Sequence, residues 1–132
     1  MEIVVDTTVV IAVITNEATK QRLIAMTQGA DLVAPASIPW EVGNAFSAMF
    51  KQKRVTKVQA LAAIAEYRKI SIRLVDIAIE DAVTVSADLG IYAYDAYMIC
   101  CAQRVRAPLL TLDARLKASA AHVGVSVIEV TP

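Results

Sequence analysis

The sequence begins Met1-Glu2-Ile3-Val4-Val5-Asp6, a short and unbroken apolar run that ends in an aspartate. The stretch Leu109-Leu110-Thr111-Leu112-Asp113 repeats this arrangement near the other end of the chain. Runs this apolar, without the alternation of a half-exposed strand, are typical of strands buried on both faces of a parallel sheet. Three more such runs separate longer stretches with helical spacing: 32–34, 72–75 and 125–130. The alternation predicts an α/β fold with helical layers on both sides of a parallel sheet.

Capping residues and glycines place the predicted helices. Ser37 is expected to cap a helix that has Pro39 in its first turn, and Thr56 to cap the next one. We see no internal repeat, low-complexity stretch or linker, so we predict a single domain over residues 1–132. The helices are expected over 7–14, 20–28, 38–51, 57–68, 79–89, 94–106 and 113–123.

The composition narrows the function classes. Of the 132 residues 57% are hydrophobic, and 13 basic residues balance 13 acidic ones. The longest apolar runs have about six residues, far fewer than the ~20 that cross a bilayer, so we expect no membrane insertion. The start of the chain lacks the features of a signal peptide, and Cys100 and Cys101 are adjacent, which favours a reducing, cytoplasmic location. Zero net charge by itself argues against a nucleic-acid partner. The apolar surplus indicates a fully buried sheet or a protein-binding surface.

Asp6 and Asp113 each come directly after a predicted strand. Ligands of open parallel sheets bind beyond the carboxyl ends of the strands, where successive connections leave in opposite directions. If the first and fourth strands are neighbours, both carboxylates reach one crevice. Each aspartate is also in a suitable position to be an ordinary helix N-cap.

Two further acids lie in predicted helices. Asp95 falls inside the apolar arc of its helix, where a carboxylate costs several kcal/mol unless it is paired or bound to a cation, so a functional role is favoured over a solvated one. Glu41 borders the apolar arc of its helix. A capping box headed by Ser37 would place its glutamate at Trp40, so capping does not explain Glu41. Taken alone, Glu41 is explained as well by a solvated side chain.

Several carboxylates in one crevice repel each other unless a divalent cation lies among them. His122 is far along the last helix, and the two cysteines are predicted on a helix face away from or beside the core. Oxygen ligands without imidazole or thiolate favour Mg²⁺ or Mn²⁺ over zinc. Such ions act on phosphate oxygens and activate water for in-line displacement at a phosphodiester.

In order and spacing the chain resembles the PIN-domain nucleases, and most closely the VapC-type ribonuclease toxins of toxin-antitoxin pairs. The resemblance covers nearly the whole chain and rests on segments that include four acids. These segments are Val4-Val5-Asp6-Thr7-Thr8, Glu41-Val42-Gly43-Asn44-Ala45, Tyr94-Asp95-Ala96-Tyr97, Pro108-Leu109-Leu110-Thr111-Leu112-Asp113-Ala114-Arg115-Leu116 and Val123-Gly124-Val125-Ser126-Val127-Ile128.

The resemblance implies a three-layer α/β/α fold around a five-stranded parallel sheet in the order 3-2-1-4-5. Asp6, Glu41, Asp95 and Asp113 would then form the quartet that binds Mg²⁺ or Mn²⁺ and catalyses cleavage, with Thr7, Thr111 and Asn44 as supporting polar residues. The family cleaves RNA, is neutralised by a cognate antitoxin of the VapB type, and forms homodimers.

Basic and aromatic residues are the candidates for RNA contact. Without the four acids, nine acidic residues face 13 basic ones, a balance of +4 that is compatible with RNA. Arg115 is favoured because it lies within one helical turn of Asp113, while a solvated surface explains each basic residue equally well. Tyrosines 92, 94 and 97 could stack on bases or pack in the core, Trp40 could border the groove, and the apolar stretch 60–65 could contact a dimer partner or antitoxin. The other basic candidates are Lys117, Lys51, Lys53, Arg54 and Lys57.

Four other classes of protein are alternatives to a toxin nuclease. A phosphoacceptor receiver domain usually has an acidic pair after its first strand, but two threonines follow Asp6. A haloacid-dehalogenase-type phosphatase needs a second aspartate where Thr8 stands. A PIN fold used only for binding or scaffolding would be expected to have lost some of the acids. A housekeeping RNA-processing PIN nuclease stays open as an alternative, and a neighbouring antitoxin gene would separate a toxin from it.

Overall fold

A computed structural model of the chain describes residues 1–130, so the last two residues of the predicted domain, 131–132, lie outside the described part. Within that part, the sheet has four parallel strands in the order β3-β2-β1-β4. Val4 and Val5 of β1 are level with Leu109 and Leu110 of β4, so the two strands end together. The strands are β1 (Glu2–Val5), β2 (Asp31–Pro35), β3 (Ile72–Val75) and β4 (Leu109–Leu110).

The prediction of a fifth strand over 125–130 is wrong as a full strand, although its place beside β4 is right. Val127 forms a single parallel bridge with Leu109. The Leu109 amide donates to the Ser126 carbonyl at 2.8 Å, and the Ile128 amide donates to the Leu109 carbonyl at 2.9 Å. The β4 strand has only two residues, rather than the four predicted, and it pairs with this segment at Leu109 alone within the described residues.

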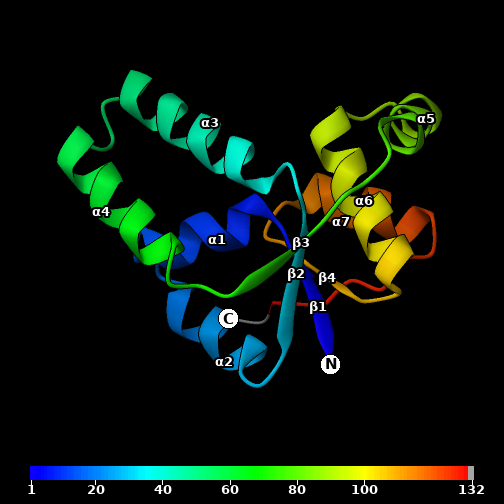
Figure 1. The fold of residues 1–132 in the computed structure, drawn as a ribbon, viewed down its shortest axis with the longest axis horizontal. Helices are drawn as coiled ribbons and strands as arrows, with labels where there is room; N and C mark the ends of the chain where they lie inside the picture. The colour runs from blue at the N-terminus through cyan, green and yellow to red at the C-terminus, as the bar shows by residue number, and fades with distance from the viewer. Residues whose placement is uncertain (131–132) are drawn as a thin grey trace.

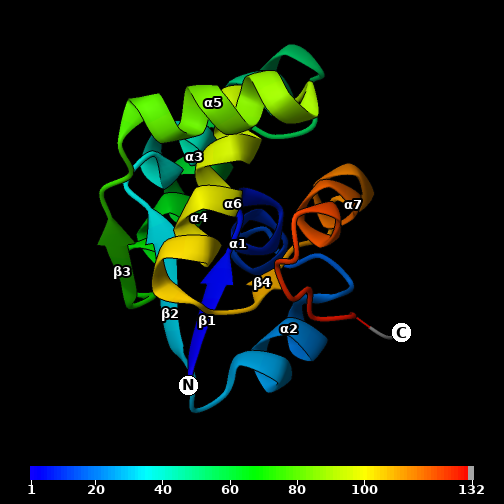
Figure 2. The same ribbon diagram turned by 90° about the vertical axis from the view of Figure 1, so that its right-hand side faces the viewer.

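The helices lie in two layers on either side of the sheet. Figure 1 shows α1 to α4 on one side and α5 to α7 on the other, with α3 and α4 forming a hairpin that extends away from the strands. Figure 2 shows α6 lying across the sheet, with α5 outside it. The helices are α1 (Thr7–Ile14), α2 (Lys20–Thr27), α3 (Ile38–Lys51), α4 (Lys57–Tyr67), α5 (Ile79–Leu89), α6 (Ala93–Val105) and α7 (Ala114–His122).

The predicted helix boundaries agree with the structure within one or two residues. Thr56 caps α4 as expected, in a capping box in which the Gln59 amide donates to the Thr56 hydroxyl at 3.2 Å. Ser37 precedes α3 but its side chain makes no capping hydrogen bond, which corrects the predicted cap. None of the helices within residues 1–130 is long and apolar enough to cross a bilayer.

The core lies between the sheet and the two helical layers. Val4, Val33, Leu109 and Leu110 of the strands and Ile99 of α6 are completely buried, as expected for a sheet covered on both faces. Cys101 is buried in this core, and Cys100 is also buried although it was predicted on the face away from the core. The reason is that α5 packs against that side of α6, a contact that the spacing within α6 cannot indicate.

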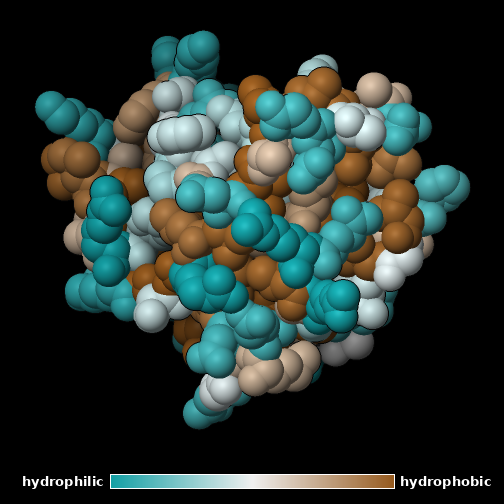
Figure 3. Space-filling model, turned by 45° about the vertical axis from the view of Figure 1, so that its right-hand side comes forward, coloured by the Kyte–Doolittle hydropathy of each residue, from teal (hydrophilic) through white to brown (hydrophobic). Residues whose placement is uncertain are grey.

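Part of the apolar surplus stays at the surface. Val58 and Leu61 of α4 and Ile79 and Val83 of α5 are each more than half exposed. On the face drawn in Figure 3, hydrophobic patches reach the surface between hydrophilic side chains. The sheet therefore accounts for only part of the apolar composition.

Candidate functional site

The four predicted acids lie at the starts of four helices. Asp6 follows β1 and caps α1, and Asp113 follows β4 and caps α7. Glu41 lies in the first turn of α3 and Asp95 in the first turn of α6. Each helix N-terminus carries partial positive charge, which stabilises a nearby carboxylate by about 0.3–1 kcal/mol. Each of the four negative side chains therefore belongs to the weakly positive end of a helix.

Asp6 is the most tightly held member of the group. Its side chain is 4% exposed, and both carboxylate oxygens accept hydrogen bonds. Oδ1 accepts from the Thr8 hydroxyl at 2.6 Å and from the Val9 amide at 3.2 Å, while Oδ2 accepts from the Thr111 hydroxyl. Thr111 in turn accepts from the Asp113 amide at 3.0 Å. Asp6 and Asp113 are thus linked through one buried threonine, as their neighbouring strands predicted.

Thr8 is a site residue that the sequence analysis did not identify. Its hydroxyl donates to Asp6 and accepts from the Leu112 amide at 2.9 Å. It also lies 3.4 Å from the Thr111 hydroxyl. Thr8 therefore joins the turn after β1 to the turn after β4. Its place two residues after Asp6 was the only available signal, and that signal does not show a contact with a residue 104 positions away.

Glu41 is held by two hydroxyl groups. Thr7 donates to Oε1 at 3.2 Å and Ser37 donates to Oε2 at 3.0 Å. Thr7 was predicted as a polar neighbour of the acids, and its contact with Glu41 places it among them. Ser37, expected to cap the helix backbone, instead orients the glutamate one turn further along. The contact explains why Ser37 is only 5% exposed.

Asp95 differs from the other three acids. Its side chain is half-buried, and no hydrogen bond to its carboxylate occurs within residues 1–130. Burial raises the pKa of Asp95, and the negative charge of Asp113 raises it further. The predicted position of Asp95 within the apolar arc agrees with this burial.

Burial also raises the pKa of two other acids of the site, Glu41 and Asp6. The pKa of Glu41 rises to about 7, because loss of water outweighs the hydrogen bonds from Ser37 and Thr7, and Asp6 and Asp95 add repulsion. The pKa of Asp6 is raised by burial, against the lowering effect of its hydrogen bonds. These mutual effects show that the four carboxylates share one electrostatic environment. Carboxylates whose charge is disfavoured in this way are typical of functional sites.

The chemistry of the group fits a hard divalent cation. The side chains named above offer carboxylate and hydroxyl oxygens, the ligands that Mg²⁺ and Mn²⁺ prefer. Among residues 1–130, no three carboxylate, imidazole or thiol groups lie close enough together to enclose a metal ion. Mg²⁺ usually keeps several waters and takes only one or two protein carboxylates. An open arrangement of four acids suits that mode of binding.

The other predicted site residues lie around or beyond the acids. Arg115 is exposed in the first turn of α7, two residues after Asp113. Asn44 is exposed on α3, and within residues 1–130 its side chain makes no hydrogen bond with the acids. Lys117 Nζ lies 4.0 Å from Glu129 Oε2. The remaining basic candidates are exposed near the far end of the α3–α4 hairpin, about 15 Å from Glu41 along α3. These are Lys51, Lys53, Arg54 and Lys57.

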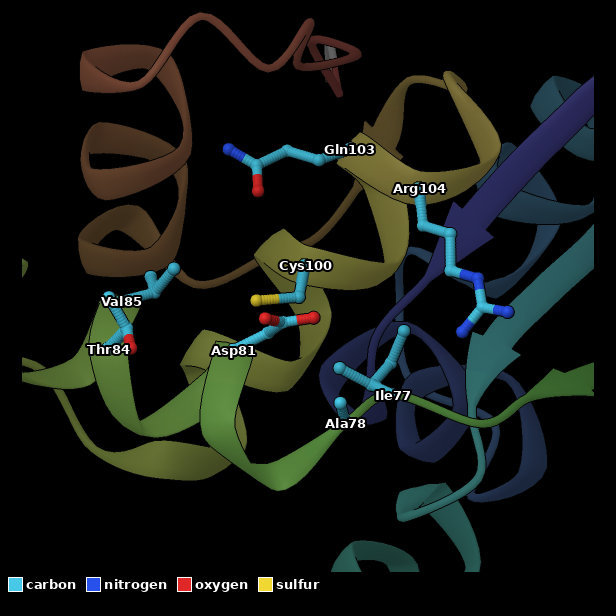
Figure 4. A pocket seen from close by; sticks show the side chains of 8 residues that line it. All are labelled: Ile77, Ala78, Asp81, Thr84, Val85, Cys100, Gln103 and Arg104. Atoms are coloured by element: carbon cyan, nitrogen blue, oxygen red, sulfur yellow. The ribbon is translucent and has the colours of Figure 1, made fainter.

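A separate hollow of about 490 Å³ lies between α5 and α6. Figure 4 shows Asp81, Cys100, Gln103 and Arg104 around it. Burial and the charge of Asp81 raise the pKa of the Cys100 thiol, which makes a reactive thiolate unfavourable. None of the four acids lines this hollow, so it is distinct from the acidic site.

Comparisons with known proteins agree with this architecture. A family model described as PIN domain matches residues 3–121. The crystal structure of PAE2754 from Pyrobaculum aerophilum superposes with a TM-score of 0.70 at 21% identity, covering 90% of this chain and 79% of that one. A chain of VapBC2 from Rickettsia felis, solved bound to a DNA fragment from their promoter, has a TM-score of 0.66 at 13% identity, covering 98% of each chain. No curated protein matches the chain in sequence. At these identities the two structures establish the fold alone.

Proposed function

Because the chain belongs to the PIN domain family, we propose that it is a metal-dependent endoribonuclease that hydrolyses RNA phosphodiester bonds. The observation that carries the proposal is that Asp6, Glu41, Asp95 and Asp113 lie at four helix starts and repel one another in pairs, with burial opposing the charge of three of them. Isolated buried charge is costly, and a bound cation would offset that cost. PIN domains are generally nucleases, which makes a phosphodiester the natural substrate.

In this mechanism the four acids would hold Mg²⁺ or Mn²⁺. A bound ion of this kind supplies a water of lowered pKa and polarises the scissile phosphate. The protein contributes mainly position and electrostatics. Thr8 and Thr111 would hold Asp6 beside Asp113, while Ser37 and Thr7 would hold the Glu41 carboxylate. Arg115 is the basic residue placed to meet the RNA backbone near Asp113, with Lys117 further along the same helix.

We further propose that this nuclease is the toxin of a type II toxin-antitoxin module, acting as a cytoplasmic homodimer with a VapB-type antitoxin as its partner. The structural likeness to a chain of a VapBC complex supports this assignment. The exposed apolar side chains of α4, Val58 at 77% and Leu61 at 59%, support a protein contact on that helix. In this proposal residues 1–132 act as one PIN domain.

The test is cleavage of single-stranded RNA oligonucleotides and total RNA by purified protein. We expect products with Mg²⁺ or Mn²⁺, none with EDTA, and none from the Asp95→Asn variant. Asp31→Asn is the matched control, because Asp31 is an exposed aspartate at the opposite end of the sheet. Cleavage that persists in EDTA, or equal cleavage by wild type and Asp95→Asn, would overturn the mechanism. An inactive wild-type protein with all four acids present would favour a binding module instead.

A further inference from the structure

Exposed aromatic rings lie directly beside two of the four acids. Trp40 precedes Glu41 in the first turn of α3 and is 69% exposed. Tyr92 caps α6 and is 86% exposed, and Tyr94, which precedes Asp95, is 43% exposed. Trp40 is the only tryptophan of the chain, and the chain has only four tyrosines. The most exposed aromatic residues of the described part of the chain therefore lie close to Glu41 and Asp95 in sequence, at the starts of α3 and α6.

Packing within the chain does not explain these rings. Among residues 1–130, neither the Trp40 nor the Tyr92 side chain makes a hydrogen bond or a cation–π contact. Tryptophan and tyrosine bury large apolar areas in most proteins, at about 25 cal/mol of stabilisation per Å². Leaving both rings in water forgoes that stabilisation. A partner outside the chain would restore it.

Trp40 and Tyr92 belong to the starts of two different helices, α3 and α6. Figure 1 shows the starts of α3 and α6 on either side of the upper end of the sheet, and the charge of Asp95 helps to raise the pKa of Glu41, in agreement with that placement. At 100° per residue, Trp40 lies about 100° around α3 from Glu41 and about 160° from the buried Ile38. It therefore borders the acids from the solvent side of α3. Tyr92 and Tyr94 border them from the start of α6.

We propose that Trp40 and Tyr92 each stack on a base of a single-stranded RNA whose intervening phosphate faces the acids. This inference rests on the proposed nuclease function and specifies how its substrate is held. Every base has a flat face that can stack on an aromatic ring, whatever its identity. In a duplex those faces are covered by neighbouring bases. Stacking on Trp40 and Tyr92 thus selects unpaired RNA and leaves the phosphate between the two bases accessible to the acids and Arg115.

Trp40 provides a direct spectroscopic test because no other tryptophan contributes to the emission. The Asp95→Asn variant, which should not cleave, is titrated in Mg²⁺ with a fluorescein-labelled RNA 10-mer and with an unlabelled one of the same sequence. Anisotropy of the label reports binding, and the tryptophan emission with the unlabelled strand reports stacking. We expect single-stranded RNA to bind and to quench Trp40, and the same sequence in a duplex to do neither.

Substitutions separate stacking from catalysis. Trp40→Ala and Tyr92→Ala should each raise the Kd for single-stranded RNA by between about 5- and 150-fold, the range expected for one stacked base. In the otherwise wild-type protein they should raise KM and leave kcat nearly unchanged. Phe50→Ala is the matched control, since Phe50 is a 43% exposed aromatic residue at the far end of the same helix. Its Kd should stay within about twofold of the parent.

Each outcome bears on a different claim. RNA that binds without quenching Trp40, or duplex that binds as well as single strand, overturns the stacking proposal and leaves the nuclease proposal intact. Trp40 emission that shifts with protein concentration alone would assign the ring to a contact between protein chains and also overturn stacking. A wild-type protein that neither binds nor cleaves any RNA contradicts the proposed function itself.

Discussion

The pair Asp6 and Asp113 and the pair Glu41 and Asp95 are held in different ways. Asp6 and Asp113 follow neighbouring strands, cap helices and accept backbone hydrogen bonds, such as that from the Arg115 amide to Asp113 at 2.8 Å. Glu41 is held by side-chain hydroxyls alone, and the Asp95 carboxylate accepts no hydrogen bond from residues 1–130. One pair belongs to the framework of the sheet, and the other is carried by the first turns of two helices.

This difference separates folding from function within one site. A carboxylate that caps a helix stabilises the fold whether or not a ligand is bound. A half-buried carboxylate without a hydrogen bond destabilises the fold until a cation arrives. Asp6 and Asp113 should therefore serve both stability and activity, whereas Asp95 should serve activity alone. Substitutions in the two pairs test this distinction.

The largest combined effect on cleavage and stability is expected from substitution of Asp6. Asp6→Ala should abolish cleavage and lower stability by about 1–3 kcal/mol, because it removes a helix cap and leaves the buried Thr111 hydroxyl without its acceptor. Thermal unfolding of the metal-free protein, followed by circular dichroism, measures the loss as a fall of roughly 5–15 °C. A variant as stable as the wild type would show that Asp6 has no framework role.

At Asp95 the same assays should show a loss of cleavage without a loss of stability. Asp95→Asn should reduce cleavage by about 10²-fold or more, the scale of losing one electrostatic contact in an active site. Its melting temperature without metal should equal or exceed that of the wild type, because the substitution removes a charge that burial disfavours. A clear loss of stability in Asp95→Asn would show that Asp95 stabilises the fold as Asp6 does, and would contradict the distinction between the two pairs of acids.

A smaller effect is expected at Thr8, which contacts both strand-end turns. Thr8→Val keeps the shape but loses the hydroxyl that bonds Asp6 and Leu112, so affinity for Mn²⁺ should fall about 10- to 100-fold. Thr8→Ser should restore much of it. Thr84→Val is the matched control, since Thr84 is exposed on α5 and bonds only its own helix. Equal Mn²⁺ affinities in the Thr8→Val and Thr84→Val variants would show that Thr8 does not position the acids.

The last prediction concerns the pH dependence of stability at Glu41. Its pKa is raised from 4.5 to about 7 in the folded protein, so its contribution to stability is complete below 4.5 and is lost as the pH rises through about 7. The difference in stability between wild type and Glu41→Gln, measured by urea unfolding without metal, should therefore move against the wild type over this window. A pH-independent difference would mean that Glu41 titrates normally.

Much of this arrangement could be predicted from residues alone. Asp6 and Asp113 are visible because buried strands end at them, and Asp95 because its helical angle puts it in an apolar arc. Thr8 and Ser37 could not be recognised, because their partners depend on side-chain directions between elements distant in sequence or one turn apart. The fifth strand was overestimated because the pattern Val125–Val130 indicates extended chain but not how many residues of β4 are free to pair. The burial of Cys100 depends on the placement of α5, which α6 does not encode.

The most direct test of the central claim, that the four acids form one cation site, is calorimetric titration of the metal-free protein with Mn²⁺. Wild type and Asp95→Asn are compared at a pH above the pKa of Glu41, in two buffers of different ionisation enthalpy. We expect saturable binding by the wild type, accompanied by proton release, and binding weakened by about 10-fold or more in the variant. Absent binding by the wild type, or identical isotherms for the two proteins, would contradict the account.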